Sequence, residues 1–560
     1  MKKPLSIGVD DFKEIISKSY YYVDKTLFIK ELIDNRSKVS LFTRPRRFGK
    51  TLTLSMIQTF FETGIDNRKY FEHLNILSAG DMYTSLMGCY PVINISLKSA
   101  KQPTYEMAYG SLINTLAKEF DRHSYLARSN ALNPEEQANF KNIMLKKSTD
   151  IEYARSLIFL SNCLEKHHRH KVIILIDEYD VPLENAYFSS FYPQMVSFLR
   201  SLFESALKTN PSLEFSVITG CLRISRESIF TGLNNLEIFS VLNHSYAEYF
   251  GFTETEVLQM IDFYNINSKY DEIRQWYDGY LFGNAEVYNP WSVINYVKAS
   301  ATTPTSLPRP YWANTSSNSI VRALVEQADF TVKQEIESLI AGGTIDKPVH
   351  EDITYEDIYK TQDNLWNFLF FTGYLKCIRE HLENETIFLT MAIPNLEVRY
   401  IFKNTVLDWF QDILKNQNRS NLYHAVLGGN PDAFSEIISD YLMESISFYD
   451  FAENYYHGFL TGLLQGFPGY AILSNRESGT DRPDILLKSP SLRKPAVIME
   501  LKLARSINDM KAACDRALEQ IETRNYQASL YEEGYRGFIA YGISFYKKEC
   551  LVKMRNSGTD

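Results

Sequence analysis

The chain has 560 residues, a formal net charge of −9, and 45% hydrophobic and 14% aromatic residues, which is enough for about three or four domains with substantial cores. No apolar run approaches the roughly 18 residues that cross a bilayer, and Asp10 and Asp11 stand where a signal peptide needs apolar residues. We therefore expect a soluble cytoplasmic protein with no membrane partner, in which nucleic-acid binding depends on local basic patches.

The six cysteines are widely separated and form no CxxC pair. This spacing argues against both a zinc ribbon and a disulfide framework. We expect the cysteines to be reduced and structural; they are Cys89, Cys163, Cys221, Cys377, Cys514 and Cys550.

The segment from Lys38 to Phe61 is predicted to form a strand, a sharp loop and a helix. Val39 to Thr43 is the strand, and apolar residues recur at helical spacing after Thr51. The free N–H groups and the positive dipole end of the helix would face the loop and favour a phosphate. In Gly49-Lys50-Thr51, Lys50 is the candidate contact to the terminal phosphates of ATP, and the Thr51 hydroxyl is the candidate Mg²⁺ ligand.

This loop departs from the usual P-loop pattern at its first position. The pattern GxxxxGK[ST] begins with glycine, whereas this chain has Arg44 followed by Pro45. The alternative interpretation is a basic turn that contains GKT by chance. The nucleotide-binding candidates are Arg44, Pro45, Arg46, Arg47, Phe48, Gly49, Lys50 and Thr51.

Three tyrosines, Tyr20, Tyr21 and Tyr22, lie between two short amphipathic segments ahead of this strand. A segment in that place often covers the base of a nucleotide, but ordinary core or interface aromatics are the other interpretation. Pro91 to Leu97 is predicted as a second strand, and a long polar helical region follows it to about Lys166.

Val172 to Ile176 is an apolar run rich in β-branched residues, and Asp177 and Glu178 follow it. The run predicts a strand buried on both faces of a parallel sheet. Two carboxylates at its end would be costly without a ligand, and open α/β sheets bind their ligands at that edge. We therefore expect a Walker B motif, in which Asp177 holds Mg²⁺ and Glu178 polarises the attacking water. A solvated strand end is the alternative.

Two further groups near this predicted sheet have two interpretations each. The run His167–His170 is either a metal site or, as we expect, a set of basic residues at a helix C-terminus. Phe215 to Gly220 is a predicted strand with Thr219 in the place of a sensor residue. Arg223 and Arg226 follow it, and they are candidates either to meet the γ-phosphate, in their own subunit or a neighbour's, or to form surface salt bridges.

The middle of the chain carries boundary signals and little recognisable chemistry. Thr253 to Glu256 predicts a capping box that begins a smaller lid. Trp276-Tyr277-Asp278-Gly279-Tyr280 and Asn289-Pro290-Trp291 are turn and helix-start signals. The proline-rich stretch Thr303 to Pro310 predicts a linker, and the chain from there to about Asn430 is expected to be mostly helical.

The last 130 residues or so predict a separate α/β domain, in the order helix, three strands, helix, strand. The predicted strands are Gly469 to Ser474, Asp484 to Leu487, Ala496 to Leu501 and Arg536 to Ile543, and the later helix runs from about Ile507 to Ile521.

A PD…ExK pattern falls on two of these strands. Asp484 begins one strand, while Glu500 and Lys502 lie two apart on the next and therefore face the same side. Such a trio suits metal-assisted phosphodiester hydrolysis, with Asp484 and Glu500 on Mg²⁺ and Lys502 at the attacking water. Glu453 would add a carboxylate and Gln520 a polar contact. A solvated strand face is the alternative.

Taken together, these motifs resemble those of bacterial AAA-ATPase-like proteins that carry a C-terminal PD-(D/E)xK nuclease-like domain. The motifs are YYVDKT, TRPRRFGKT, ILIDEYD, ITGCLRISRESIFTGLNN, YDGY, YNPWS, YHGFL, SNRESGTDRPD and MELK. The resemblance implies an α/β fold with an AAA-type ATPase in the first half and a restriction-endonuclease-like fold at the end. It implies site roles for Lys50, Thr51, Asp177 and Glu178, and for Glu453, Asp484, Glu500, Lys502 and Gln520.

From these observations we expect four regions: a P-loop ATPase domain at 1–245, a lid at 246–302, a mostly helical connecting domain at 303–430 and a nuclease-like domain at 431–560. The expected function is ATP binding and hydrolysis coupled to Mg²⁺-dependent cleavage of nucleic acid, with DNA as the expected substrate. The rival is an ATP-driven switch or scaffold whose last domain only binds nucleic acid or protein. A homo-oligomer is a candidate assembly.

Overall fold

The computed structural model describes residues 2–222, 229–230, 233–313, 321–322, 326, 329–349, 355, 360–416, 419–444, 453–474 and 483–556. The chain forms two compact units. The first contains Met1–Asn318 and Thr344–Ile401, and the second contains Ser319–Gly343 and Phe402–Asp560.

A five-stranded parallel sheet forms the centre of the first unit, in the order β2-β3-β4-β1-β5. Strands β1 and β3 are buried along their whole length, as expected for a sheet covered on both faces. The loop after β1 and the carboxylates at the end of β3 therefore reach the same edge of the sheet, with β4 between them. The strands are β1 (Val39–Thr43), β2 (Val92–Ser96), β3 (Val172–Asp177), β4 (Leu213–Gly220) and β5 (Leu236–Phe239).

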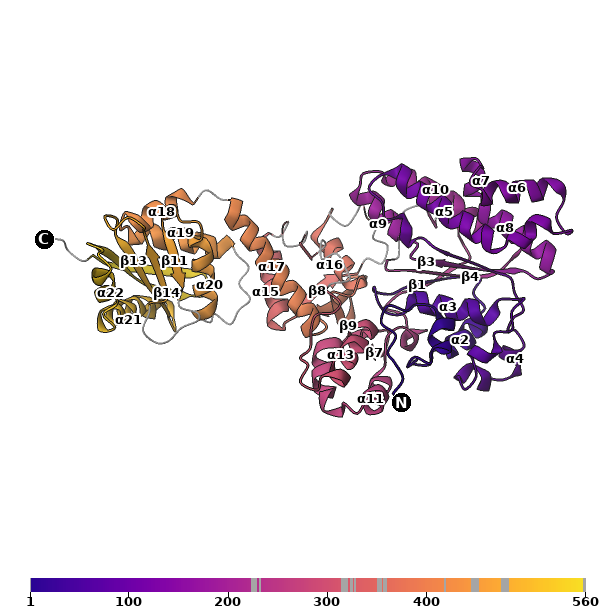
Figure 1. Cartoon of the computed structure of the whole chain (residues 1–560), viewed down its shortest axis with the longest axis horizontal. Helices are drawn as coiled ribbons and strands as arrows, with labels where there is room; N and C mark the ends of the chain where they lie inside the picture. Colours follow the sequence, from indigo (N-terminus) through magenta and orange to yellow (C-terminus); the bar gives the residue numbers. More distant parts are fainter. Residues whose placement is uncertain are drawn as a thin grey trace. The chain divides into compact units, whose positions relative to one another are not determined.

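Helices cover both faces of this sheet (Figure 1). Helices α2 and α3 lie on one face, and α5, α8 and α10 lie on the other. The helices of this part are α1 (Phe12–Ser17), α2 (Leu27–Asn35), α3 (Lys50–Phe61), α4 (Asp81–Thr84), α5 (Tyr105–Arg122), α6 (Pro134–Met144), α7 (Asp150–Ala154), α8 (Ser156–His168), α9 (Val181–Phe188) and α10 (Tyr192–Leu207).

A smaller helical part follows the sheet and has its own core. Its elements are α11 (Glu254–Phe263), α12 (Tyr270–Tyr277), β6 (Tyr280–Phe282), β7 (Ala285–Val287) and α13 (Pro290–Thr302). The capping box that the sequence predicts is present: Thr253 accepts from the Glu256 N–H, and the Glu256 side chain accepts from the Thr253 N–H. Buried residues of α11, α12 and α13 pack together, and Leu5 and Tyr21 from the N-terminal segment join them.

The region after the linker contains strands that the sequence analysis did not anticipate. Beside α16 (Gln362–Phe371) lies a three-stranded antiparallel sheet in the order β8-β10-β9. Most residues of β9 are exposed or half-buried, so this strand gives little of the apolar alternation by which a strand is recognised in a sequence. The strands are β8 (Ile345–Pro348), β9 (Lys376–Glu383) and β10 (Thr386–Ala392).

The second unit is built on a five-stranded mixed sheet in the order β11-β12-β13-β14-β15. Only the β13–β14 pair is parallel. The strands are β11 (Ala471–Ser474), β12 (Ile485–Lys488), β13 (Ala496–Leu503), β14 (Phe538–Tyr546) and β15 (Glu549–Asn556). The first four match the predicted strands, and β15 is an addition to them.

Two cores lie on the two sides of this sheet. One contains buried residues of α18, α19 and α20, and the other contains buried residues of α21 and α22. Helix α21 approaches β14 closely, because a Cβ on Gly542 would lie 2.4 Å from the Cys514 carbonyl oxygen. The helices of this unit include α15 (Phe330–Ala341), α18 (Ser420–Leu427), α19 (Pro431–Glu444), α20 (Glu453–Leu464), α21 (Met510–Thr523) and α22 (Tyr526–Glu532). Helix α17 (Leu396–Asn416) contains the point where the first unit ends.

Candidate functional site

The loop after β1 has the backbone of a phosphate-binding turn. Gly49 has φ 88° and precedes α3 directly, a left-handed conformation that glycine adopts without steric cost. Helix α3 begins at Lys50, so its first free N–H groups face the loop. This arrangement, with the helix dipole behind it, favours an anion.

The Lys50 ammonium lies inside this loop. Its Nζ donates to the carbonyl oxygens of Arg44 at 2.8 Å and Pro45 at 2.9 Å, and it lies 3.5 Å from Cys221 Sγ. The residue is only 5% exposed. Two carbonyl oxygens of the loop therefore hold the Lys50 ammonium in place.

Asp177 receives hydroxyl hydrogen bonds from two neighbouring elements. Thr51 Oγ1 donates to one carboxylate oxygen at 2.8 Å, and Thr219 Oγ1 donates to the other at 2.6 Å. Asp177 is 2% exposed. Hydroxyl and carboxylate oxygens are the donors that Mg²⁺ prefers, so Thr51 and Asp177 fit the cation that the sequence assigns to them. Glu178 follows in a left-handed conformation, with φ 51°.

The sequence analysis missed Asp180, which holds the end of β4. Its Oδ2 accepts from the N–H groups of Cys221 at 2.7 Å and Leu222 at 3.1 Å. Burial raises the pKa of Asp180 to about 6. The available signal was its place in the run DEYD, directly after the buried strand. Arg223 and Arg226, which come next along the chain, lie outside the described residues.

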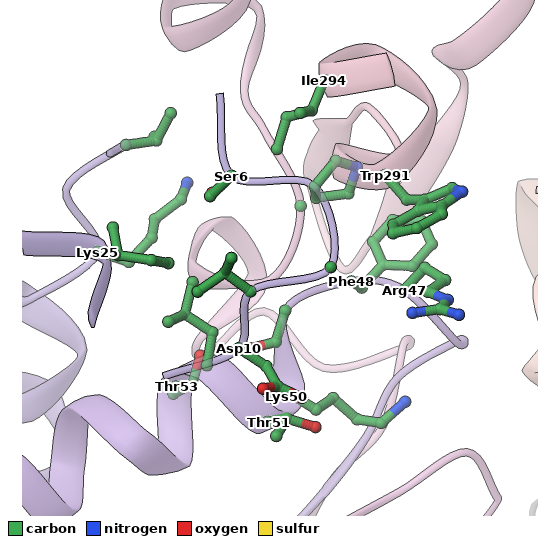
Figure 2. A pocket seen from close by; sticks show the side chains of 18 of the residues that line it. Ser6, Asp10, Lys25, Arg47, Phe48, Lys50, Thr51, Thr53, Trp291 and Ile294 are labelled. Carbon is green, nitrogen blue, oxygen red and sulfur yellow. Dashed lines mark hydrogen bonds between the residues drawn. The ribbon is translucent and has the colours of Figure 1, made fainter. Parts of the chain in front are cut away.

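A cavity of about 360 Å³ opens beside this loop, within the range of small-molecule sites. The N-terminal segment, the loop with the start of α3, the segments that follow β2 and β3, and the helical part that follows the sheet all line it. Figure 2 shows Lys50, Thr51, Phe48 and Trp291 around it. Tyr21, Tyr22 and Glu178 are also among the lining residues, and Tyr21 packs in addition against the core of the helical part.

The prediction that the Arg44 side chain binds the nucleotide needs correction, because this side chain is fully buried away from the cavity. Pro45, another predicted contact, is not among the lining residues. The Arg44 side chain turns into the protein, donates to the Phe239 carbonyl at 2.7 Å, and lies 5.2 Å from the ring centres of Phe250 and Phe282. Burial lowers its pKa to about 9, so it remains a cation at neutral pH. Arg46, Arg47, Phe48, Gly49, Lys50 and Thr51 do line the cavity.

The histidines before β3 lie at the C-terminal end of a helix, which is where the sequence analysis places them. His167 and His168 form the last turn of α8. Burial and the neighbouring histidines lower the pKa of His168 to about 4. Within the described residues, no group of three or more histidine, cysteine, aspartate or glutamate side chains could hold a metal ion.

The PD…ExK residues meet in the second unit, where β12 and β13 pair antiparallel. Ile485 lies opposite Met499, which places the preceding Asp484 beside Glu500. The Asp484 Oδ2 accepts from the Leu501 N–H at 2.8 Å, and the Asp484 N–H points to Glu500 Oε2 at 3.4 Å. The register of two strands thus brings together two carboxylates 16 residues apart.

Glu500 is the buried centre of this group. It is 2% exposed, and burial, together with the charge of Asp484, raises its pKa to about 7. Lys502 Nζ lies 3.5 Å from Glu500 Oε1, and the Gln520 amide donates to the same oxygen. Two facing carboxylates with one ammonium leave negative charge uncompensated, so the residues fit a divalent cation.

The remaining helix contributes differently from the prediction. Glu453 begins α20, but its side chain lies outside the described residues. One turn later, His457 Nε2 lies 2.8 Å from the Asp484 carbonyl oxygen. The sequence analysis did not single out His457, because nothing in the local pattern links it to a residue 27 positions away.

Other features of the described structure bear on cysteine chemistry and on membranes. All six cysteines are free, as expected. None of the helices in the described part of the chain combines the length and the hydropathy that a bilayer crossing requires.

Comparison with known proteins gives a match in each half of the chain. Residues 6–230 match the family described as predicted AAA-ATPase, and residues 451–555 match the PD-(D/E)XK nuclease superfamily. A protein of Azotobacter chroococcum mcd 1, described as "Uncharacterized protein in vnfD 5'region", is 28% identical over 333 residues. That match covers 59% of this chain and 58% of the relative, less than two thirds of its length. The first match contains strands β1 to β4 and the second falls on the mixed sheet, so the chain joins a part similar to the AAA-ATPase-like family to a part similar to the PD-(D/E)XK nuclease superfamily.

Proposed function

We propose that the protein binds and hydrolyses ATP and uses the nucleotide state to control a Mg²⁺-dependent nuclease in the same chain. The observation that carries the proposal is the convergence of Lys50, Thr51 and Asp177 beside a lined cavity. The same chain holds a second convergence, that of Asp484, Glu500, Lys502 and Gln520.

In the ATPase part, each described side chain has one role. Lys50 exchanges its two carbonyl partners for phosphate oxygens of ATP, while Thr51 and Asp177 hold Mg²⁺. Glu178, at the end of β3, accepts a proton from the attacking water and orients it. Arg223 remains a proposed contact to the γ-phosphate. When bound, Mg²⁺ neutralises charge on the phosphate oxygens.

In the nuclease part, Asp484 and Glu500 are the proposed Mg²⁺ ligands, and Glu453 is the proposed additional carboxylate. Lys502 orients the attacking water and stabilises charge on the phosphate. Gln520 fixes the orientation of Glu500 through its amide. When bound, Mg²⁺ polarises the phosphodiester and lowers the pKa of its water.

We propose nucleic acid as the substrate class, with DNA as our proposal, because Asp484, Glu500 and Lys502 suit metal-assisted hydrolysis of a phosphodiester. We propose a cytoplasmic location, a homo-oligomer as a candidate assembly, and the four-region division at 245, 302 and 430.

A second candidate function has one observation in its favour. The pKa of Glu500 is raised to about 7, so near neutral pH this carboxyl is partly protonated when no cation is present. A site of this kind suits an ATP-driven switch or scaffold whose last domain binds nucleic acid or protein without cleaving it.

One assay separates the two candidates. Supercoiled plasmid and a single-stranded RNA are incubated with the full chain and Mg²⁺ or Mn²⁺, beside the Glu500→Ala variant. The nuclease proposal expects cleavage by the parent alone. No cleavage of either nucleic acid, in the presence or absence of ATP, would favour the switch or scaffold.

A further inference from the structure

Residues outside the sheet hold the atypical phosphate-binding loop on several sides. Pro45 lies against Gly373, where an added Cβ would come within 2.8 Å of Pro45 Cβ. The Phe48 ring packs edge-on against the Tyr280 ring, with 4.9 Å between their centres. The Arg47 guanidinium lies 4.4 Å from the ring centre of Trp291. Figure 2 shows the two side chains next to each other. The loop conformation therefore depends on elements that come more than two hundred residues later in the chain.

Trp312 makes the one described side-chain hydrogen bond to the loop carbonyl of Arg46. Its indole Nε1 donates to that oxygen at 3.2 Å. Trp312 is 1% exposed, and its ring packs against Tyr374 at 4.9 Å. The indole does not line the nucleotide cavity, so any effect on ATP must pass through the loop backbone.

Glu397 in turn fixes the position of Trp312. One carboxylate oxygen accepts from the Trp312 backbone N–H at 2.8 Å, and the Ser292 hydroxyl donates to the carboxylate at 2.8 Å. Glu397 is fully buried, and burial raises its pKa to about 7. A buried carboxyl is expensive unless such donors surround it. Ser292 directly follows Trp291, so both tryptophans at the loop are tied to this one carboxyl.

We propose that Trp312 and Glu397 are positioning residues of the nucleotide site, which set the loop backbone around Lys50 without touching ATP. The inference rests on the proposed function and adds a control element to it. It also accounts for arginine at the first loop position. The loop backbone is held by the Arg44 side chain, which is buried in the core, and by the Trp312 indole, so its conformation does not depend on a glycine there.

The position of Glu397 links the loop to the helix in which the first unit ends. Glu397 is the second residue of α17, the helix that contains the end of the first unit at Ile401. A change in the loop that alters the Trp312 and Glu397 hydrogen bonds therefore acts on the first turn of the helix that leads out of the ATPase unit.

The test compares two buried tryptophans, of which one donates a hydrogen bond to the loop and the other does not. Trp312→Phe removes the donor to Arg46 and keeps an aromatic ring. Trp366→Phe is the matched control, because Trp366 is also fully buried and its indole N–H has no partner within the described structure. Calorimetric titration of the full chain with ATP and Mg²⁺ should show affinity weakened about 3- to 10-fold in Trp312→Phe, the effect of one lost hydrogen bond, and changed by less than about twofold in Trp366→Phe.

Variants of Glu397 give a readout that simple loss of packing would not. Glu397→Gln keeps an oxygen for the Trp312 N–H and should retain affinity within about threefold of the parent at pH 6, whereas Glu397→Ala should lose at least as much as Trp312→Phe. The groups facing Glu397 that titrate are the phenols of Tyr277, Tyr280 and Tyr311, whose pKa values lie above 10. Between pH 6 and 8 the parent should therefore gain affinity relative to Glu397→Gln, as the carboxylate ionises and accepts its hydrogen bonds more strongly.

The outcomes are distinguishable from a failure of the ATP site itself. If the parent and Lys50→Ala bind ATP equally, or the parent binds none, the proposed function falls and this inference falls with it. If the parent binds ATP and Lys50→Ala does not, equal affinities for Trp312→Phe and Trp366→Phe overturn the inference alone. A parent-to-Glu397→Gln ratio that stays constant from pH 6 to 8 would also overturn the role given to Glu397.

Discussion

The two candidate sites of this chain handle buried charge in opposite ways. At the ATPase site, Asp177 receives two hydroxyl hydrogen bonds, and Lys50 is held by two carbonyl oxygens. At the nuclease site, Glu500 faces a second carboxylate, and the charge of Asp484 adds to burial in raising its pKa to about 7. At the ATPase site, hydrogen bonds within the protein satisfy both charged groups. At the nuclease site, negative charge remains that a proton or a cation can neutralise.

The difference predicts how each site should respond to substitution and to competition from protons. A site whose contact residues are already fixed should lose function through single changes at those residues. A site with two facing carboxylates should bind its cation in competition with protons. The predictions below test these two expectations.

The largest effect is expected at Lys50. Lys50→Ala removes the charge that faces the phosphates and little core volume, so ATP binding should fall at least about 100-fold while the thermal unfolding temperature stays close to that of the parent. Calorimetric titration and circular dichroism measure the two quantities. ATP binding like that of the parent would refute the P-loop assignment.

Glu178→Gln sharpens the same half of the comparison. The change removes the group that orients the water and keeps Asp177 for the cation, so ATP should bind normally and be hydrolysed at least about tenfold more slowly. Phosphate release under single-turnover conditions is the measurement. A variant that hydrolyses ATP at the parental rate would assign this role to another group.

At the second site, single replacements of Asp484, Glu500 or Lys502 by Ala should each abolish metal-dependent cleavage, by about 100-fold or more. The triple variant should be little worse, because groups that act as one unit are not additive. Plasmid cleavage rates at fixed Mg²⁺ measure this. Undiminished cleavage by purified Glu500→Ala would point to a contaminating nuclease or to another site.

At the nuclease site, the affinity for the metal ion should depend on pH. With a pKa of about 7, Glu500 is mostly protonated at pH 6 and mostly ionised at pH 8, so Mg²⁺ or Mn²⁺ affinity should rise by about tenfold over that interval. Without metal, the raised pKa has the opposite effect: the stability it contributes is present below pH 4.5 and is lost as the pH rises towards 7. Titration with Mn²⁺ and urea unfolding at the two pH values give both quantities. Glu500→Gln should flatten both, and a parent whose metal affinity does not change with pH would contradict the account.

Sequence alone predicts these sites to different depths. Strand β3 was predictable because it is a continuous apolar run that ends in its functional carboxylate, and β1 because a short, mostly apolar run precedes the GKT loop. The meeting of Asp484 with Glu500 was predictable because the two residues fall on consecutive predicted strands in a PD…ExK pattern. In both cases the pattern and the chemistry lie in the same short segment.

The unpredicted features depend on contacts between distant segments. The Arg44 side chain donates to a carbonyl 195 residues away, and Trp312 donates to one 266 residues away. The sequence around Arg44 and Trp312 gives no indication of either hydrogen-bond partner. Arg44 was assigned to the nucleotide because a cation in a phosphate-binding loop usually has that role, and only its burial among Phe239, Phe250 and Phe282 shows otherwise.

The smallest expected effect, and the one that would break the separation of the two sites, is their coupling. Nuclease cleavage is already downhill, so ATP would serve to position or license the cut. For that control, the ATP and ADP forms must differ in their preference between two arrangements, because equal affinity for both shifts nothing. We expect the cleavage rate to differ by about 3- to 10-fold between no nucleotide, ADP and a non-hydrolysable ATP analogue, and Lys50→Ala to remove the differences. Identical parental rates in all three conditions, matched by the variant, would leave two independent sites on one chain.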